Sequence, residues 1–307
     1  MASPSNRRNF LRSAMLAAGV GAWAGNGSPR AARAIEPIVR NGKSFFKFSM
    51  AAYSYRDLLN AKDPKQQLTL DDFIADCAKL GLHGTELTSY YFPQDLTPEY
   101  LRHVKQLCFR LGLDISGTAV GNDFCLPPGE KREQEIALVK RWIDYAEILG
   151  APVIRIFSGH PQDTSVEEAH RLAVEGIEEC CQYAGDHGVF LALENHGGLT
   201  ATAEGLLALV RDVKSPWFGV NLDTGNFHGA DFYDETKQLA PYALNVQIKV
   251  SVSGPDGKRH HADFRRLATI LSEADYRGYI VLEFEEPEDP LTACPRYVDE
   301  MRAAFTL

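Results

Sequence analysis

Hydrophobic positions along the chain alternate between two spacings from residue 45 onward. Residues 45–54 form an apolar run typical of a strand, and residues 70–80 show the spacing of an amphipathic helix. That helix ends at Gly81, a residue suited to a helix C-terminus. The same order, a strand followed by a helix, recurs along the rest of the chain.

Eight such units are predicted. After the first strand, strand-like runs lie at 83–88, 113–118, 152–157, 189–194, 217–222, 243–249 and 279–284. Amphipathic stretches lie near 97–112, 131–149, 163–187, 201–212, 232–240, 261–274 and 291–305. Eight alternating units predict an α/β fold, a single-domain (β/α)8 TIM barrel. No glycine-rich dinucleotide fingerprint follows an early strand, which argues against a doubly wound sheet.

The composition agrees with one folded domain. The chain has 307 residues, of which 45% are hydrophobic and 24% charged, and this excludes a disordered chain, a collagen-like repeat and a small disulfide scaffold. Its six cysteines show no CxxC pair and no Cys/His spacing of a zinc site. We assign the cysteines no role.

The first 34 residues differ in charge from the rest. They contain five arginines and no acidic residue, although the whole chain has a net charge of −9. Arg7 and Arg8 precede a run of small and apolar residues from Ala14 to Ala24, a pattern that resembles a twin-arginine export signal. The run is shorter than the roughly 20 residues of a membrane span. We therefore expect an export signal at 1–34, a linker at 35–44, a barrel at 45–307, and a periplasmic location.

Ionisable and amide side chains lie at the ends of the later strands. Glu194 ends the fifth strand, Asp223 the sixth, Gln247 lies in the seventh and Glu283 in the eighth. The carboxyl ends of barrel strands form the functional face of this fold. Buried carboxylates that converge there would repel one another unless a cation joined them. We therefore expect a divalent metal held by these four residues, whose oxygen ligands favour Mg, Mn or Co, with Zn as a further choice. The alternative is that each acid caps a helix or pairs with Arg or Lys.

The four strand ends belong to longer motifs that resemble a known family. LALENHGG at 191–198, GVNLDTGNF at 219–227, NVQIKV at 245–250 and GYIVLEFE at 278–285 are similar in order and spacing to the xylose isomerase-like TIM barrels. That family contains sugar and sugar phosphate isomerases and epimerases, among them ketose 3-epimerases, hydroxypyruvate isomerase and inosose dehydratase. The chain departs from the commonest pattern in the seventh strand, where many relatives have His and it has Gln247.

The resemblance implies a metal-dependent sugar isomerase or epimerase that acts through an enediolate. It implies that Glu194, Asp223, the strand-seven residue and Glu283 bind the metal, and that Glu194 and Glu283 also move the proton. No P-loop is present, so we favour an unphosphorylated ketose or keto-sugar derivative. The residues leave isomerisation, epimerisation and dehydration open.

Other residues are candidates for substrate binding. Arg155 interrupts the apolar run VIRIF and is expected to point into the barrel, and Glu86 is expected to close the second strand. His196 and His228 follow the metal strands, and Lys249 lies two residues after Gln247. The alternative for each is a structural ion pair or a loop residue.

Two further classes of protein were compared with the enzyme. A DNA-repair endonuclease of the related barrel type would need a His-rich metal cluster and a basic groove, and the acidic net charge argues against it. An exported sugar-binding barrel without catalysis stays open. We expect a small carbohydrate as the binding partner, no nucleic acid, and no membrane contact after the signal is removed. A homo-oligomer stays open.

Overall fold

Eight parallel strands close into a barrel in the computed structural model, which describes residues 35–161, 164–229, 231–254 and 258–306. The barrel strands are β1 (Phe45–Ala51), β2 (Gly84–Thr88), β3 (Asp114–Ala119), β4 (Val153–Ile156), β5 (Phe190–Glu194), β6 (Phe218–Asp223), β7 (Ala243–Lys249) and β10 (Arg277–Glu283). Each strand pairs with its neighbours in the chain order, and β10 closes the barrel against β1. The predicted TIM barrel fold is confirmed.

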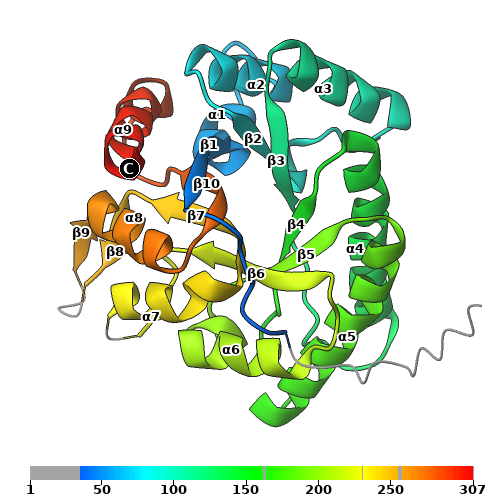
Figure 1. Ribbon diagram of the computed structural model, residues 1–307. Coiled ribbons are helices and arrows are strands. Elements are labelled where there is room, and N and C mark those ends of the chain that lie inside the picture. The colour runs from blue at the N-terminus through cyan, green and yellow to red at the C-terminus, as the bar shows by residue number, and fades with distance from the viewer. Residues whose placement is uncertain (1–34, 162–163, 230, 255–257, 307) are drawn as a thin grey trace, which may run out of the picture. The chain divides into compact units, whose positions relative to one another are not determined.

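Helices surround this barrel (Figure 1). They are α1 (Arg56–Leu59), α2 (Leu70–Lys79), α3 (Pro98–Arg110), α4 (Glu130–Leu149), α5 (Val166–Asp186), α6 (Ala203–Asp212), α7 (Phe232–Leu239), α8 (Phe264–Glu273) and α9 (Pro290–Phe305). None of these helices is long and apolar enough to cross a membrane. The predicted export signal at 1–34 lies outside the described residues.

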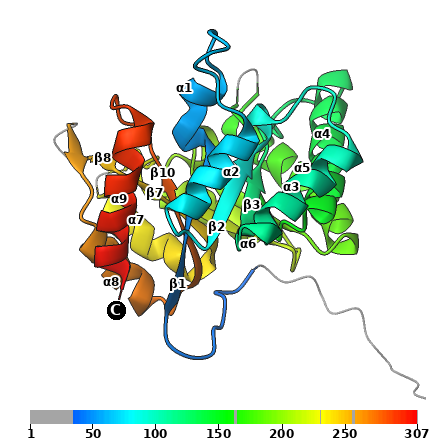
Figure 2. The same ribbon diagram turned by 90° about the horizontal axis from the view of Figure 1, so that it is seen from above.

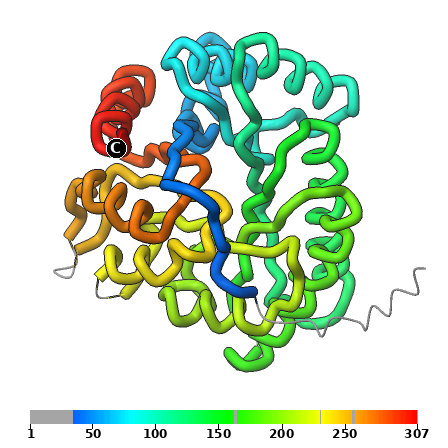
Figure 3. Tube along the Cα trace, viewed as in Figure 1, coloured from blue at the N-terminus to red at the C-terminus, as the bar shows by residue number. Residues whose placement is uncertain are grey.

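The first described segment, 35–44, contains no helix or strand and runs across one end of the barrel before β1 begins (Figure 3). The Ile38 N–H donates to the Pro241 carbonyl, 2.9 Å away, just before β7. This is the end where the strands start. The short helix α1, which follows β1, lies at the opposite end, where the strands finish (Figure 2).

Helix starts are fixed by side chains that accept hydrogen bonds from the first turn. Thr69 accepts from the Asp72 N–H, and the Asp72 carboxylate accepts from the Thr69 N–H in return, which satisfies two backbone donors of α2 at once. Side chains at Thr97, Ser165, Thr202, Asp231, Asp263 and Asp289 cap α3, α5, α6, α7, α8 and α9. These caps fix where each loop at the functional end becomes a helix.

Alternation along the strands separates the core from the site. In β5, Leu191 and Leu193 are fully buried in the hydrophobic layer, and Glu194 follows on the opposite face. The register pairs Asp223 with Gln247, and Glu283 with Lys249. Side chains that are far apart in sequence are therefore neighbours around the rim of the barrel.

The structure differs from the sequence prediction at two points. The first strand ends at Ala51, and residues 52–55 form a tight 3-10 turn instead of continuing the strand to Ser54. Residues 251–253 and 259–261 pair as a small antiparallel hairpin, β8 (Ser251–Ser253) and β9 (Arg259–His261), so the next helix begins at Phe264 rather than 261. Three-residue strands with exposed partners give no hydrophobic period to detect.

Candidate active site

Three of the predicted carboxylates converge at the ends of β5, β6 and β10. Glu194, Asp223 and Glu283 have exposed fractions of 3%, 0% and 6%. A buried carboxylate is costly unless a cation or hydrogen bonds compensate it. The two cations that meet these carboxylates are Arg155 from β4 and Lys249 from β7, both also buried.

Arg155 points into the barrel and forms an ion pair with Glu194. The Arg155 Nε lies 2.9 Å from Glu194 Oε2, and Asn226 Nδ2 donates to Glu194 Oε1 at 2.9 Å. Burial nevertheless raises the pKa of Glu194 to about 7, because Arg155 offsets only part of the lost solvation. Glu194 can therefore gain or lose a proton near neutral pH.

Asp223 accepts hydrogen bonds at one of its two carboxylate oxygens. Its Oδ1 accepts the N–H groups of Gly225 (2.7 Å) and Asn226 (3.1 Å). Its Oδ2 is buried, has no hydrogen bond within the described residues, and lies 3.3 Å from Lys249 Nζ. Burial raises the pKa of Asp223 well above its usual range. This oxygen is directed at whichever cation occupies the centre of the site.

Lys249 occupies that centre. Its Nζ lies 2.6 Å from Glu283 Oε2 and 2.6 Å from Glu285 Oε1. Burial favours the neutral amine, but the surrounding carboxylates outweigh it and raise the pKa of Lys249. In return, burial would raise the pKa of Glu283, but Lys249 outweighs it and lowers that pKa. A β-carbon at Gly225 would lie only 2.4 Å from Lys249 Cγ, so this glycine leaves room for the lysine stem.

Gln247, the fourth predicted ligand, lies in a separate polar layer. Its Nε2 donates to Glu86 Oε1 at 2.7 Å, and its Oε1 accepts from Asn221 Nδ2 at 2.6 Å. Asn245 Nδ2 donates to the other Glu86 oxygen at 2.7 Å. Burial raises the pKa of Glu86 to about 7.

The sequence indicated that Glu86 closes the second strand, and the structure shows that it does not. Strand β2 continues to Thr88, because Leu87 and Thr88 still pair with β3. Glu86 therefore lies two residues before the end of β2, inside the barrel, where its carboxylate meets the amides of Gln247 and Asn245. Its carboxylate accepts hydrogen bonds from Gln247 and Asn245, and Arg155 pairs with Glu194 instead.

The site opens into a cavity of about 230 Å³. Its walls are formed by Tyr53, Tyr90, Arg155, Phe157, Glu194, His196, Asn226, Lys249, Glu283 and Glu285. His196 is among them and packs against Phe157, with ring centroids 4.4 Å apart and the ring planes tilted by 40°. Burial lowers the pKa of His196. His228 is exposed and does not line the cavity.

Five wall residues were not predicted as site residues, namely Tyr53, Tyr90, Phe157, Asn226 and Glu285. Tyr53 and Tyr90 follow β1 and β2, and Phe157 follows β4, but aromatic residues after a strand are too common to single out. Asn226 had a detectable signal, because it lies three residues after Asp223 within the motif GVNLDTGNF. A strand-end acid followed by a polar residue in the next turn places both on one cavity.

The charges of the site suit a metal ion, but the side chains are not arranged to coordinate one. Among the described residues, Arg155 and Lys249 are the cations that act on the four buried carboxylates Glu86, Glu194, Asp223 and Glu283. The surplus of carboxylates, and an Asp223 Oδ2 that forms no hydrogen bond within the described residues, suit a divalent cation. Within the described residues, however, no group of three or more His, Cys, Asp or Glu side chains is placed to hold a metal ion. Lys249 stands between the carboxylates that would do so.

Comparison with known proteins agrees with this geometry. The sequence pattern of the family described as "Xylose isomerase-like TIM barrel" matches residues 74–302. The chain belongs to the xylose isomerase-like TIM barrel family. The family resemblance predicted from the four strand-end motifs is confirmed.

Several solved structures share the fold of this chain. A D-psicose 3-epimerase from Clostridium cellulolyticum H10 has a TM-score of 0.71 at 16% identity, over 85% of this chain and 100% of that one. A 3-keto-D-glucoside 4-epimerase from E. coli has a TM-score of 0.68 at 16% identity, over 84% and 100%. A probable 3-DHS dehydratase from Bacillus anthracis has a TM-score of 0.64 at 20% identity, over 85% and 99%. At these identities the similarity shows the fold alone.

Proposed function

We propose that this xylose isomerase-like barrel is a sugar isomerase or epimerase, which moves a proton at the carbon beside the carbonyl of a ketose or keto-sugar derivative. The observation that carries the proposal is the pair Glu194 and Glu283, two buried carboxylates in different environments on one small cavity. Environments that separate the pKa values of two acids are the mark of an acid and base pair.

The two glutamates take complementary parts. Glu283, whose pKa Lys249 lowers, stays ionised and is suited to remove the proton. Glu194, whose pKa lies at about 7, can hold a proton and return it. Return to the opposite face of the same carbon gives an epimer, and return to the neighbouring carbon gives an isomer.

Cationic side chains support the negative charge that develops on the substrate oxygens. Arg155 and Lys249 both line the cavity and both carry a charge fixed by buried partners. Preorganised charge in a site closed to water is the strongest means of stabilising an oxyanion. Asn226 and His196 add hydrogen-bonding groups to the same walls.

The metal is part of this proposal. Glu194, Asp223 and Glu283 would hold a divalent cation such as Mn, Mg or Co, which would polarise the carbonyl as a Lewis acid. For these carboxylates to do so, Lys249 must leave Asp223 and Glu283 and keep only Glu285. Gln247 would join them only if it released Asn221 and Glu86.

Export through the twin-arginine pathway is a separate proposal, supported by Arg7 and Arg8 before an apolar run. Cell fractionation of a bacterial host tests it. Replacement of both arginines by lysine should retain the protein in the cytoplasm, and unchanged periplasmic recovery would contradict it.

The enzymatic proposal is tested with ketoses, keto-glycosides and inososes in deuterated water. Deuterium should enter at the carbon beside the carbonyl, and product analysis by NMR separates an epimer, an isomer and a dehydrated product. No exchange with any compound, with added Mn²⁺ or without it, would contradict the proposal.

A further inference from the structure

A second, larger pocket lies beside the catalytic cavity. Its volume is about 810 Å³, against about 230 Å³ for the cavity that holds the glutamates. Ligand pockets usually measure roughly 300–1,000 Å³, so the inner cavity is small for a complete ligand and the outer pocket is not. The outer pocket is formed by residues 59–71 after β1, residues 90–94 after β2, and Tyr100 of α3.

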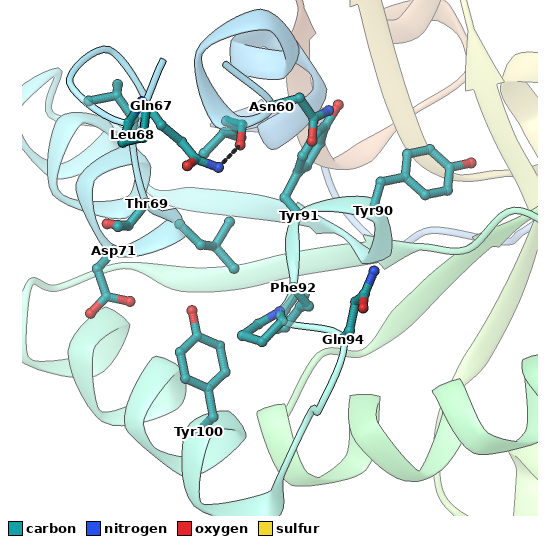
Figure 4. A pocket seen from close by; sticks show the side chains of 14 residues that line it. Asn60, Gln67, Leu68, Thr69, Asp71, Tyr90, Tyr91, Phe92, Gln94 and Tyr100 are labelled. Atoms are coloured by element: carbon teal, nitrogen blue, oxygen red, sulfur yellow. Dashed lines mark hydrogen bonds between the residues drawn. The ribbon is translucent and has the colours of Figure 1, made fainter. Parts of the chain in front are cut away.

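Aromatic rings and unpaired amides share this outer pocket. Figure 4 shows the amides of Asn60 and Gln94 and the rings of Tyr91 and Tyr100 around it. Within the described residues, the amide groups of Asn60 and Gln94 and the hydroxyls of Tyr91 and Tyr100 form no hydrogen bond, unlike that of Gln67, which donates to the Leu59 carbonyl. These groups are available to a ligand that carries many hydroxyls.

The charge of the pocket narrows the ligand further. Asp71 is the one charged side chain among the residues that line it, and its Oδ2 is already paired with His103 Nε2 at 2.5 Å. No Lys or Arg is among its lining residues, all of which are described, to bind a phosphate or a carboxylate. A neutral polyhydroxyl group with apolar C–H faces matches this mixture of rings and amides.

Tyr90 connects the two spaces. It is a wall residue of both the catalytic cavity and the outer pocket. Its ring packs edge to face with Tyr91, with centroids 6.2 Å apart. A β-carbon at Gly121 would lie 2.9 Å from the Tyr90 hydroxyl, so the ring points toward the β3 side of the barrel mouth. A ligand that passes over Tyr90 would reach both spaces at once.

We infer that the outer pocket is a subsite for an uncharged second sugar unit, so that the enzyme acts on a glycoside rather than on a free monosaccharide. This inference rests on the proposed function, because the keto-sugar unit would occupy the cavity of Glu194 and Glu283. The second unit packs on the rings after β2 and accepts hydrogen bonds from Gln94 and Asn60.

Binding measurements test the subsite without any need for turnover. The probes are glucose, fructose, cellobiose, maltose, trehalose and sucrose. Their binding to the full chain is measured by saturation-transfer NMR and by calorimetry. At least one disaccharide should bind about tenfold more tightly than its component monosaccharides, with protons of both rings in contact. Gln94→Ala should weaken that disaccharide severalfold and leave monosaccharide binding unchanged.

Matched variants guard against a general effect. Tyr100→Phe removes only a hydroxyl from the pocket and should weaken the disaccharide alone, whereas Phe109→Ala alters an exposed ring elsewhere on α3 and should change neither ligand. Equal binding of monosaccharides and disaccharides by the wild type would overturn the subsite. So would a Gln94 or Tyr100 variant that loses monosaccharide binding as much as disaccharide binding.

Failure of the subsite and of the proposed function are distinguishable. Exchange of deuterium into monosaccharides without preference for any disaccharide would overturn the subsite and leave the function standing. Tight disaccharide binding without any exchange would leave the subsite standing and overturn the catalytic proposal.

Discussion

Lys249 and Glu283 face each other across adjacent strands, and the lysine Nζ lies 2.6 Å from the carboxylate Oε2. The same Nζ lies 3.3 Å from Asp223 Oδ2, the buried oxygen without a hydrogen bond. An ammonium group therefore stands where a divalent cation would have to bind. Lysine and metal compete for the same two carboxylates in this account.

Replacement of Lys249 by methionine should strengthen metal binding. Methionine keeps most of the side-chain length but removes the charge that competes for Asp223 and Glu283. We expect Mn²⁺ to bind at least about tenfold more tightly, measured by the loss of the free-ion paramagnetic resonance signal. The matched control is Lys237→Met, which removes a charge paired with Glu273 on the surface and should change nothing.

The partner Glu285 provides a second check on the same competition. Glu285→Gln removes the acid that would hold Lys249 away from the metal, so Mn²⁺ should bind more weakly in this variant. The effect should vanish in the Lys249→Met background, because no lysine is left to hold. Additive effects of the two substitutions would contradict the competition.

Arg155 should be needed for stability as well as for function. Arg155→Met leaves the buried Glu194 without its cation, and breaking a buried ion pair in this way costs about 3–5 kcal/mol of unfolding free energy. Urea unfolding measures it. The double variant with Glu194→Gln should recover much of the loss, whereas Arg171→Met, at an exposed helix pair, should cost little. Equal losses in the Arg155 and Arg171 variants would speak against a buried pair.

Glu86 should make the protein less stable as the pH rises. Its pKa is about 7 in the folded chain and about 4.3 in an unfolded one, so the folded state holds more protons between these values. Unfolding free energy therefore falls as the pH rises from about 4.3 through 7.

Glu86→Gln isolates that contribution. The variant cannot ionise, although its amide offers Gln247 and Asn245 one acceptor where the carboxylate offers two. Measured against the difference at low pH, its unfolding free energy should gain on that of the wild type by an amount on the order of 4 kcal/mol at pH 8. The difference should shrink toward pH 5. Glu36→Gln, at an exposed position, is the control, and parallel pH curves for Glu86→Gln and the wild type would refute the prediction.

The sequence predicted the barrel because hydrophobic period and strand-end acids are local signals. Each of the eight strands repeats the same alternation, and Glu194, Asp223 and Glu283 end or nearly end their strands. Arg155 was also predicted to turn inward, since an arginine inside an apolar strand has no other polar surroundings to reach.

The arrangement of partners could not be predicted, because it depends on register and on depth within the barrel. Whether Gln247 meets the rim or the layer of Glu86 depends on where β2 ends relative to β7. Whether Lys249 joins Asp223 depends on the β6 to β7 register and on the space left by Gly225. Neither relationship is encoded by a residue and its immediate neighbours.

The central claim is that Glu194 and Glu283 move a proton on a sugar. Its most direct test is solvent deuterium exchange into a compound that the wild type turns over, followed by NMR in Glu283→Gln and Glu194→Gln. Both variants should bind the compound while exchange slows by roughly 100-fold or more, as expected for loss of a general acid or base. His228→Asn, at an exposed residue outside the cavity, should exchange at the wild-type rate. Exchange that continues unchanged in Glu283→Gln would contradict the account.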